Sequence, residues 1–278
     1  MLRAAHRPAG WSATGPAPVI PDQLDGLWPS ADEDLCWLAG NWRLLQRTDG
    51  HRTSLDDLVT AHRAAALVAD KPPRRCLDLG CGIGSVLLFL AWRFPTAQFL
   101  GIEAQSVSAG LARRSLAWNG VTDRAQVLTH DFRDCESLAQ QAPFDLVTGT
   151  PPYFPLDAGP QSAHIQRGPC RFEHRGGIEA YCAAAAPLLA EGAPFIACQA
   201  WTQRDRVAPA ARAAGLALVG WQEIIPREGK EPLLCVFAMR RAAHAEALAM
   251  APPLVVRDRS GRRTDAFVAV RSAMGMPP

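Results

Sequence analysis

Two consecutive prolines follow an apolar run in the middle of the chain, where Phe144–Val147 leads into Thr150–Pro155. Proline has a fixed φ angle and no N–H group, so the carbonyl oxygens of such a turn accept hydrogen bonds with no competing donors. A conjugated NH2 group is a poor nucleophile, but acceptors that bind both of its hydrogens free its lone pair. We therefore predict that this turn positions an amino nitrogen for attack on a bound electrophile, through Thr150, Pro151, Pro152 and Tyr153. The alternative is a proline-rich turn that only ends a strand.

A glycine-rich turn lies upstream, where residues 77–84 read Leu-Asp-Leu-Gly-Cys-Gly-Ile-Gly. Glycines let the backbone turn sharply and let a ligand approach closely, although the pattern alone also fits an ordinary tight turn. Asp78, just before the glycines, would repel a pyrophosphate but suits a ligand with an ammonium group. This favours S-adenosylmethionine over a dinucleotide, with a water-mediated or helix-capping role for Asp78 as the alternative. The predicted cofactor contacts in this turn are Asp78, Gly80, Cys81, Gly82 and Gly84.

Acidic residues also follow the next two strand-like runs. Glu103 comes about 20 residues after the glycines, where a carboxylate is placed to accept both hydroxyls of a ribose. Asp131 follows residues 127–130 and is placed to accept from an adenine amino group, while Phe132 lines the ring. Either acid alone would be an ordinary surface carboxylate, but their order after the glycine turn predicts a cofactor site. We expect Thr150 to border the cofactor as well.

Aromatic and basic residues downstream of the prolines are candidates for substrate contacts. Tyr153 and Phe154 offer flat faces on which a base can stack. Residues 163–175 carry three arginines, which suit either a phosphate-binding loop or a solvated loop with equal weight. A second basic run at 257–263 is a phosphate-contact candidate only if it lies beside the site. The substrate residues we predict are Tyr153, Phe154, His164, Arg167 and Arg171.

Strand-like and helical runs alternate through the part of the chain that carries these residues. Such alternation predicts a mainly parallel sheet covered by helices on both faces. The last two strands, 216–225 and 233–239, are joined by a short loop, so they must pair as an antiparallel hairpin. We therefore predict an α/β, Rossmann-like fold with a seven-stranded sheet. Five of its strands are expected at 74–79, 98–102, 125–129, 144–148 and 193–200, and the hairpin supplies the other two. Helices are expected at 83–94, 104–119 and 178–190.

The economical domain organisation is a single domain over residues 22–278. It comprises an N-terminal helical extension (22–73), the Rossmann-like core (74–241) and a C-terminal segment (242–278). Within the extension, Ser54 is a suitable N-cap for a helix that Pro72-Pro73 ends. Residues 1–21 contain no acid and no apolar core of a secretory signal, so we expect a disordered tail, with an organelle transit peptide as the alternative.

Composition narrows the class of protein without choosing a substrate. A chain of 278 residues, 48% of them hydrophobic, can bury a full core, and its net charge of +2 gives no global field for nucleic acid. The eight cysteines show no spacing that would hold zinc, and we expect no bound metal and a reduced, cytoplasmic setting. No run approaches the roughly 18 apolar residues that a membrane span needs. The oligomeric state is not predictable.

The four chemical segments, in this order, resemble class I (Rossmann-like) S-adenosylmethionine-dependent methyltransferases with an N-P-P-Y type signature. That group includes adenine-N6 and cytosine-N4 methyltransferases and the release factor glutamine methyltransferase. Residues 45–56 are similar to the Q-x-x-x-G-x-R-x-S-x-D segment of the bacterial tRNA(Val) adenine-N6 methyltransferases, and residues 226–232 to the loop of that family's final hairpin. The resemblance covers residues 42–256 and implies that Arg52 and Asp56 lie near the methionine end of the cofactor.

The resemblance implies an S-adenosylmethionine-dependent N-methyltransferase acting on an exocyclic amino group, with adenine N6 in RNA (tRNA) as the first hypothesis. The chain departs from the family at Thr150, where Asn, Asp or Ser is usual, and a threonine hydroxyl has a shorter reach than a carboxamide. The acceptor therefore stays open, and a protein glutamine, a peptide or a small metabolite is the alternative. A weakly catalytic, cofactor-binding scaffold is a further alternative. No general base is required, because a methylated amino nitrogen readily loses its proton to water.

Overall fold

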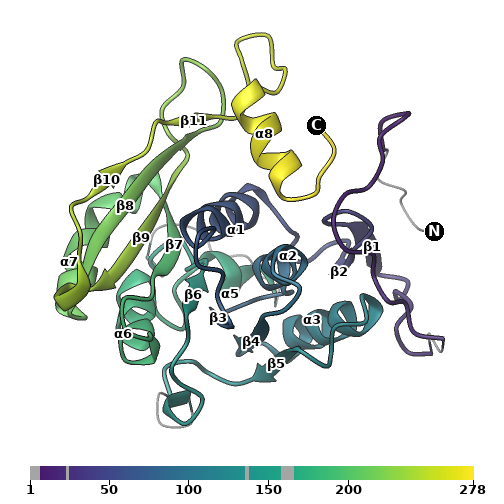
Figure 1. Cartoon of the computed structure of the whole chain (residues 1–278), viewed down its shortest axis with the longest axis horizontal. Coiled ribbons are helices and arrows are strands. Elements are labelled where there is room, and N and C mark those ends of the chain that lie inside the picture. Colours follow the sequence, from purple (N-terminus) through teal and green to yellow (C-terminus); the bar gives the residue numbers. More distant parts are fainter. Residues whose placement is uncertain (1–6, 23–24, 135–137, 158–165) are drawn as a thin grey trace.

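A nine-stranded sheet forms the centre of the protein in a computed structural model that describes residues 7–22, 25–134, 138–157 and 166–278. The strand order is β10-β8-β9-β7-β6-β3-β4-β5, with β11 also paired to β8 (Figure 1). Five strands pair in parallel: β3 (Arg75–Leu79), β4 (Gln98–Glu103), β5 (Ala125–Thr129), β6 (Leu146–Gly149) and β7 (Phe195–Ala200).

Helices cover both faces of this sheet. Successive residues of a strand point to opposite faces, so consecutive apolar residues give each face an apolar surface that helices bury. Cys76 and Leu146 belong to the core beneath one set of helices, and their neighbours Leu77 and Val147 belong to the core beneath the other. The first set is α1 (Leu55–Leu67), α2 (Ser85–Arg93) and α3 (Ser106–Trp118). The second is α6 (Ile178–Leu188) and α7 (Val207–Ala213), which is preceded by the short helix η1 (Trp201–Arg206).

The sheet ends in the expected hairpin. β8 (Leu216–Ile225) pairs antiparallel with β9 (Leu234–Arg241), and β9 pairs antiparallel with β7. The predicted Rossmann-like α/β fold is confirmed, with β3 to β9 as its seven longer strands. The additional β10 (Ala249–Met250) and β11 (Leu254–Val255) pair in parallel with β8 and are too short to leave a periodic pattern in the sequence.

The C-terminal segment adds two further elements to the core. η2 (Ala242–His244) follows β9, and α8 (Asp265–Ala273) packs against α1 and β11. The N-cap of α8 is Thr264, whose hydroxyl accepts a hydrogen bond of 3.2 Å from the backbone N–H of Phe267. The remaining short helix, α5 (Arg167–Arg171), lies between β6 and α6 in the chain.

The N-terminal extension is not wholly helical, and this prediction was wrong for residues 22–53. β1 (Glu33–Trp37) and β2 (Arg43–Arg47) form an antiparallel pair, and the helical expectation holds only for α1. Backbone N–H groups on the free edge of β2 donate hydrogen bonds to side chains of α3 and its C-cap. The Ser115 hydroxyl accepts from the Leu45 N–H at 2.9 Å, and Asn119 Oδ1 accepts from the Arg43 N–H at 2.8 Å. Tertiary hydrogen bonds of this kind stabilise a strand that the local sequence does not specify.

Residues 7–21, expected to lie within a disordered tail, run along the surface without regular structure but with defined contacts. The Val19 N–H donates to the Asn119 carbonyl at 3.2 Å, and Trp42 Nε1 donates to the Pro16 carbonyl at 3.1 Å. Residues 1–6 lie outside the described part of the chain. Within the described residues, no helix combines the length and apolar character that crossing a membrane requires.

Candidate functional site

The loops that follow β3, β4, β5 and β6 meet at one edge of the sheet, since parallel strands end on the same side. They enclose a pocket of about 820 Å³ that is open to solvent, and the N-terminal end of α1 closes one side of it. Most predicted site residues line this pocket: Asp56, Gly80, Cys81, Gly82, Glu103, Asp131, Phe132, Thr150, Pro151, Pro152 and Tyr153. The glycine turn and the double-proline turn therefore form two walls of one cavity.

The other predicted residues lie elsewhere. Among the described residues, the pocket lining does not include Arg52, Asp78, Gly84, Phe154 or Arg171. Arg171 is exposed at the end of α5, and Arg167 is the first residue of that helix. His164 lies outside the described residues.

The glycine turn brings its backbone against α6. Gly80 has a φ of 59°, and a Cβ at this position would lie 2.1 Å from the hydroxyl oxygen of Tyr181. Both the positive φ and the close approach therefore require glycine here. Gly82, by contrast, has no heavy atom within 4 Å of the point where its Cβ would be, so its backbone is open to a ligand.

Asp78 lies beneath this turn and is not among the residues that line the pocket, so its direct contact with the ligand stays a prediction. Its side chain is buried, and Oδ1 accepts a hydrogen bond of 2.8 Å from the Thr148 hydroxyl. Burial raises the pKa of Asp78 to about 7, against the opposing effect of hydrogen bonds from Thr148 and from the Leu87 N–H in the first turn of α2. Asp78 therefore supports the turn from below through its bond to Thr148 in β6.

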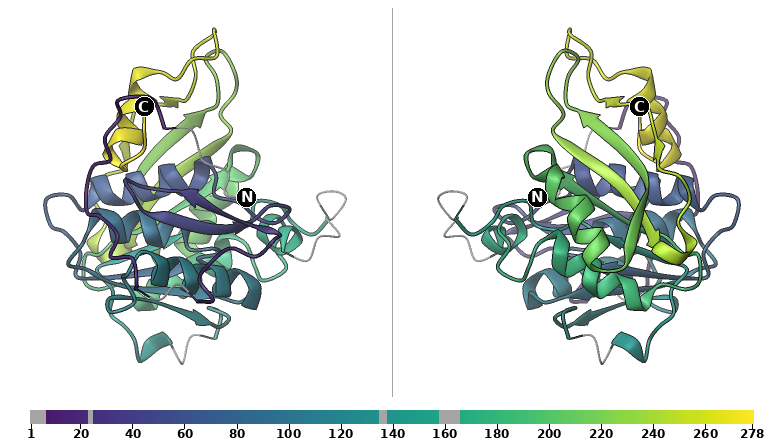
Figure 2. Two further views of the ribbon diagram at one scale, coloured as in Figure 1. Left: turned by 90° about the vertical axis from the view of Figure 1, so that its right-hand side faces the viewer. Right: turned by 90° about the vertical axis from the view of Figure 1, so that its left-hand side faces the viewer.

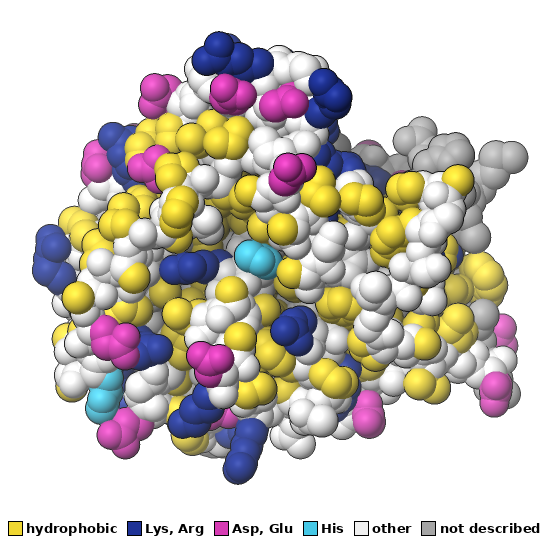
Figure 3. Space-filling model, turned by 45° about the horizontal axis from the view of Figure 1, so that its top comes forward, with side chains coloured by type: hydrophobic (Ala, Val, Ile, Leu, Met, Phe, Trp, Pro, Cys, Tyr) yellow, Lys and Arg dark blue, Asp and Glu magenta, His cyan; other side chains and the backbone are white. Residues whose placement is uncertain are grey.

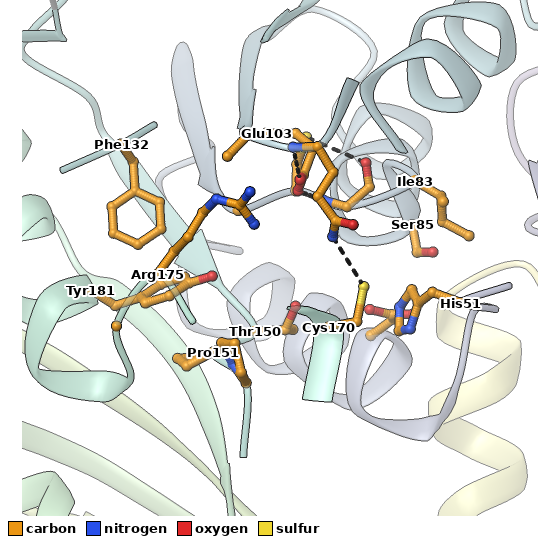
Figure 4. A pocket seen from close by; sticks show the side chains of 18 of the residues that line it. His51, Ile83, Ser85, Glu103, Phe132, Thr150, Pro151, Cys170, Arg175 and Tyr181 are labelled. Atoms are coloured by element: carbon orange, nitrogen blue, oxygen red, sulfur yellow. Dashed lines mark hydrogen bonds between the residues drawn. The ribbon is translucent and has the colours of Figure 1, made fainter. Parts of the chain in front are cut away.

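Glu103 ends β4 at the middle of the pocket (Figure 4). Its Oε2 accepts from the Gly82 N–H at 2.9 Å and its Oε1 from the Gln105 N–H at 2.6 Å. Burial raises the pKa of Glu103, while these two hydrogen bonds and the charge of Arg175 act to lower it. A carboxylate has further lone pairs beyond the two used here, so Glu103 can still accept hydrogen bonds from a ligand.

An aromatic wall lies at one end of the pocket. The rings of Phe132 and Tyr181 are 4.4 Å apart between centroids, and both side chains are buried. Beside them, Asp131 accepts two hydrogen bonds from Arg133, at 2.9 and 2.6 Å, and these lower its pKa. Sequence analysis missed Tyr181, although an aromatic residue within the alanine-rich stretch of α6 was a usable signal.

The double-proline turn is tied to the first turn of α1. The Tyr153 hydroxyl donates to Asp56 Oδ2 at 2.8 Å and lies 3.3 Å from the sulfur of Cys198. Burial and the charges of Cys198 and Asp56 raise the pKa of Tyr153 well above its ordinary value, so the phenol stays protonated. Tyr153 therefore fixes the position of the turn as part of the pocket wall.

The segment 45–56 positions this helix end through its own hydrogen bonds. Gln46 Oε1 accepts from the Thr53 N–H at 3.1 Å, and the Ser54 N–H donates to Asp57 Oδ2 at 3.1 Å. Arg52 donates to Asp34 in β1 at 2.9 Å and to the Arg47 carbonyl at 3.1 Å. These bonds hold Arg52 against the β1–β2 pair and outside the pocket lining, and its place near the methionine end of the cofactor stays a prediction.

His51 lies in the pocket in place of Arg52 and was missed from the sequence (Figure 4). Its backbone N–H donates to the Oε1 of the buried Gln166 at 3.1 Å, and Gln166 in turn donates to Ser108 in α3. Burial acts to lower the pKa of His51, but a hydrogen bond to Cys170 and the negative charges of Asp56 and Glu103 raise it. His51 is therefore held close to a cluster of acidic groups.

Further lining residues were also missed: Asp57, Ile83, Ser85, Ala104, Gln105, Cys170, Arg175 and Gly176. Of the described lining residues, Asp56, Asp57, Glu103 and Asp131 have acidic side chains, and only His51 and Arg175 have basic ones. Burial and the neighbouring charge of Asp56 raise the pKa of Asp57 to about 7. An excess of acidic groups suits a ligand that carries positive charge.

An apolar cleft of about 840 Å³ adjoins the pocket on the far side of Tyr153. Asp56 and Tyr153 line both cavities. The aromatic rings of Phe154 and Trp201 belong to the cleft, and the Arg204 guanidinium lies 4.3 Å from the centroid of the Trp201 ring. The residues that line it are Ser54, Leu55, Asp56, Tyr153, Phe154, Ala200, Trp201, Thr202, Pro232, Leu233 and Leu234.

Comparison with known proteins identifies the domain. Residues 76–160 match the family described as "Methyltransferase domain". The chain carries a class I methyltransferase domain. The structure of a predicted O-methyltransferase from Agrobacterium tumefaciens has the same fold, with a TM-score of 0.61 and 21% identity over 80% of this chain and 98% of that one. Such a domain implies S-adenosylmethionine as cofactor.

Two named relatives are similar to parts of the chain. A tRNA1(Val) (adenine(37)-N6)-methyltransferase of Porphyromonas gingivalis is 36% identical over 105 residues, which cover 37% of this chain and 41% of that protein. A release factor glutamine methyltransferase of Rhodospirillum rubrum is 32% identical over 212 residues, which cover 70% of this chain and 62% of that protein. In both cases the match covers less than two thirds of the relative's length.

Proposed function

We propose that this protein is an S-adenosylmethionine-dependent N-methyltransferase whose acceptor is the exocyclic amino group of an adenine in RNA, most simply a tRNA. One observation carries the proposal: the glycine turn and the double-proline turn line the same pocket. A donor bound on the glycines would then face acceptor oxygens that have no competing N–H groups.

The order of residues along the pocket fits S-adenosylmethionine. Phe132 and Tyr181 lie at one end, Glu103 in the middle, and His51 and Ser85 at the other end (Figure 4). We assign the aromatic end to the adenine, Glu103 to the ribose hydroxyls, and the end with His51 to the methionine portion. The acidic lining complements a cofactor that has a sulfonium and an ammonium group.

S-adenosylmethionine, when bound, supplies an electrophilic methyl group. The carbonyls of Thr150 and Pro151 would accept hydrogen bonds from the two hydrogens of the acceptor NH2 and leave its lone pair free to attack. Tyr153, fixed by Asp56, would hold the turn at the right distance, and positioning of this kind supplies much of the rate enhancement. The proton that the methylated nitrogen loses would pass to water, so no side chain has to act as general base.

The apolar cleft supports a planar acceptor. It borders Tyr153 and presents Phe154 and Trp201, and aromatic side chains of this kind stack on bases. The similarity to tRNA adenine-N6 methyltransferases supports the same choice. A protein glutamine is the second candidate, because the match to a release factor glutamine methyltransferase extends over more of the chain. The cytoplasmic location stays a prediction.

Labelled S-adenosylmethionine offered with purified bacterial tRNA, release factor protein and a small-metabolite fraction in separate reactions tests the proposal. We expect label in the tRNA, as N6-methyladenosine after nuclease digestion and mass spectrometry. Glu103→Gln, which weakens the proposed ribose contact, serves as the negative control. Label in the release factor alone would establish the second candidate, and label in no fraction would favour a cofactor-binding scaffold.

A further inference from the structure

Two loops that are distant in the sequence form one basic projection, which we call the basic knob. It consists of residues 226–232, between β8 and β9, and residues 257–263, between β11 and α8. The Glu228 N–H donates to the Arg257 carbonyl at 2.8 Å, and Arg259 Nε lies 3.2 Å from Glu228 Oε1. Figure 2 shows the two loops together at the apex of the molecule.

The topology places the basic knob at the same edge of the sheet as the pocket, where the parallel strands have their carboxyl ends. β8 is antiparallel to β9, which is antiparallel to β7, so β8 runs in the direction of the parallel strands and ends at their carboxyl edge. β10 and β11 run parallel to β8 and bring residues 257–263 to that edge as well. Pro232 and Leu233, at the root of the knob, line the apolar cleft together with Tyr153 and Phe154.

Positive charge is concentrated in the basic knob. It holds six basic and three acidic side chains, a net charge of +3, whereas the whole chain carries +2, so the remaining residues sum to −1. All six basic side chains are exposed: Arg227, Lys230, Arg257, Arg259, Arg262 and Arg263. Figure 3 shows Lys and Arg side chains, with acidic ones among them, at this end of the molecule above a band of hydrophobic side chains.

These charges are largely uncompensated. Among the described residues, Arg259 is the only one of the six that forms a salt bridge with a carboxylate side chain, and it is 81% exposed. Asp258 is engaged within its own turn, where Oδ1 accepts from Ser260 Oγ at 2.6 Å and from the Arg262 N–H at 3.0 Å. Burial, and to a lesser extent the charges of Arg263 and Arg257, lower the pKa of the nearby Arg271 to about 10.

We propose that the basic knob binds the phosphate backbone of an RNA acceptor while one of its bases enters the apolar cleft. This inference rests on the proposed function and supports RNA as the methyl acceptor. Lys and Arg side chains that bind phosphates position a nucleic acid without reading its sequence, and base contacts then select the nucleotide. A protein acceptor has no comparable line of negative charges to offer six exposed basic groups. The basic run at 257–263 lies against the loop 226–232, whose Pro232 lines the apolar cleft.

The experiment compares two variants with equal loss of charge. The knob variant combines Arg227→Gln, Lys230→Gln, Arg259→Gln and Arg262→Gln, and it leaves Arg257 and Arg263, which donate to backbone carbonyls, in place. The control variant combines Lys71→Gln, Arg74→Gln, Arg93→Gln and Arg212→Gln, four exposed residues near the starts of β3, β4 and β8 at the opposite edge. Binding of purified tRNA is titrated at several salt concentrations, and calorimetry measures S-adenosylmethionine binding by each protein.

We expect the knob variant to bind tRNA at least about tenfold more weakly than wild type, with a salt dependence whose slope is smaller by about one unit for each phosphate that the variant no longer binds. The control variant should stay within about twofold, and all proteins should bind the cofactor equally. Equal tRNA binding by the two variants, or no tRNA binding by wild type, would overturn the inference. Absence of cofactor binding by wild type would instead overturn the proposed function.

Discussion

At the scale of single residues, His51 is the basic group nearest the proposed methionine end of the pocket (Figure 4). We predict that its imidazolium binds the cofactor carboxylate. His51→Gln should weaken S-adenosylmethionine binding by about 10- to 100-fold, the size of a hydrogen bond to a charged group. Decarboxylated S-adenosylmethionine, which lacks only the carboxylate, should bind wild type and variant alike in calorimetry.

The pH dependence of this contact has a definite sign. The pKa of His51 is raised, so its cationic form persists to a higher pH than in a free histidine. Cofactor affinity should be tightest below this pKa and should weaken as the pH rises through it. His244→Gln, a histidine outside the pocket, is the matched control. A His51→Gln variant that keeps the wild-type preference for the carboxylate would exclude the assignment.

The hydrogen bond between Tyr153 and Asp56 permits a second prediction. Tyr153→Phe removes this bond of 2.8 Å and frees the double-proline turn from α1. We expect single-turnover methylation to slow by about tenfold, as misplacement of a reacting group does, with a decrease of about 1 kcal/mol in the free energy of unfolding. Cofactor affinity should change little. An unchanged turnover rate would show that the turn keeps its position without Asp56.

Most of the pocket residues were predictable, because glycines, acids and prolines after successive strands are placed by the fold. Asp78 and Arg52 lie outside the pocket lining, and a sequence does not show which charged groups find partners within the protein, here Thr148 and Asp34. His51, Cys170 and Arg175 were missed because loops outside the strand ends bring them into the pocket. No local pattern encodes those approaches.

At the scale of elements, the connection between β2 and α1 depends on a close approach at Gly50. A Cβ at this position would lie 1.9 Å from Gln166 Oε1, which accepts from the His51 N–H. Gly50→Ala should displace the buried Gln166 and lower the free energy of unfolding by about 1–3 kcal/mol, the cost of an unsatisfied buried polar group. Chemical denaturation measures this change.

Gly110 offers a control at which alanine should raise, and not lower, the free energy of unfolding. It lies within α3, and its Cβ would meet no heavy atom within 4 Å. Gly110→Ala should therefore stabilise the protein by about 0.5–1 kcal/mol, because alanine is the better helix former. Equal effects at both positions would mean that the contact of Gly50 with Gln166 has no energetic weight.

Apart from α7, which was not predicted, the regular elements of the core were predictable within a few residues, since strands and helices of this length carry clear apolar patterns. The β1–β2 pair was not, because its stability comes from Ser115 and Asn119 at the end of α3. Strands of two residues, such as β10 and β11, depend on the edge of β8 that receives them. These elements are specified by tertiary contacts.

At the scale of the whole molecule, buried acids govern how stability depends on pH. The pKa values of Asp57 and Asp78 are raised to about 7, mainly by burial. The folded state therefore binds more protons than the unfolded state between about pH 4 and pH 7, and the free energy of unfolding should fall as the pH rises through that range. Thermal melting of the cofactor-free protein across this range measures the fall.

Asp78→Asn removes one of these titrations and should make the fall shallower, while the exposed Asp123→Asn should keep the wild-type slope. Stability that rises with pH in the wild type would contradict the assigned directions.

The spatial arrangement of the C-terminal segment also belongs to this scale. Its sequence shows a basic run, but only the pairing of β11 with β8 places that run beside the loop 226–232, which reaches the apolar cleft at Pro232. Charge counts taken along the chain could not show this, because the net charge of +2 is the sum of a basic knob and a slightly acidic remainder.

The central claim is that the glycine turn, Glu103 and the double-proline turn form one S-adenosylmethionine site. Calorimetric titration of S-adenosylmethionine into wild type and Glu103→Ala tests this claim most directly. The account predicts micromolar binding by wild type and binding at least about tenfold weaker in the variant, because the variant lacks a carboxylate that accepts hydrogen bonds from the ligand. No binding by wild type, or equal binding by both proteins, would contradict it.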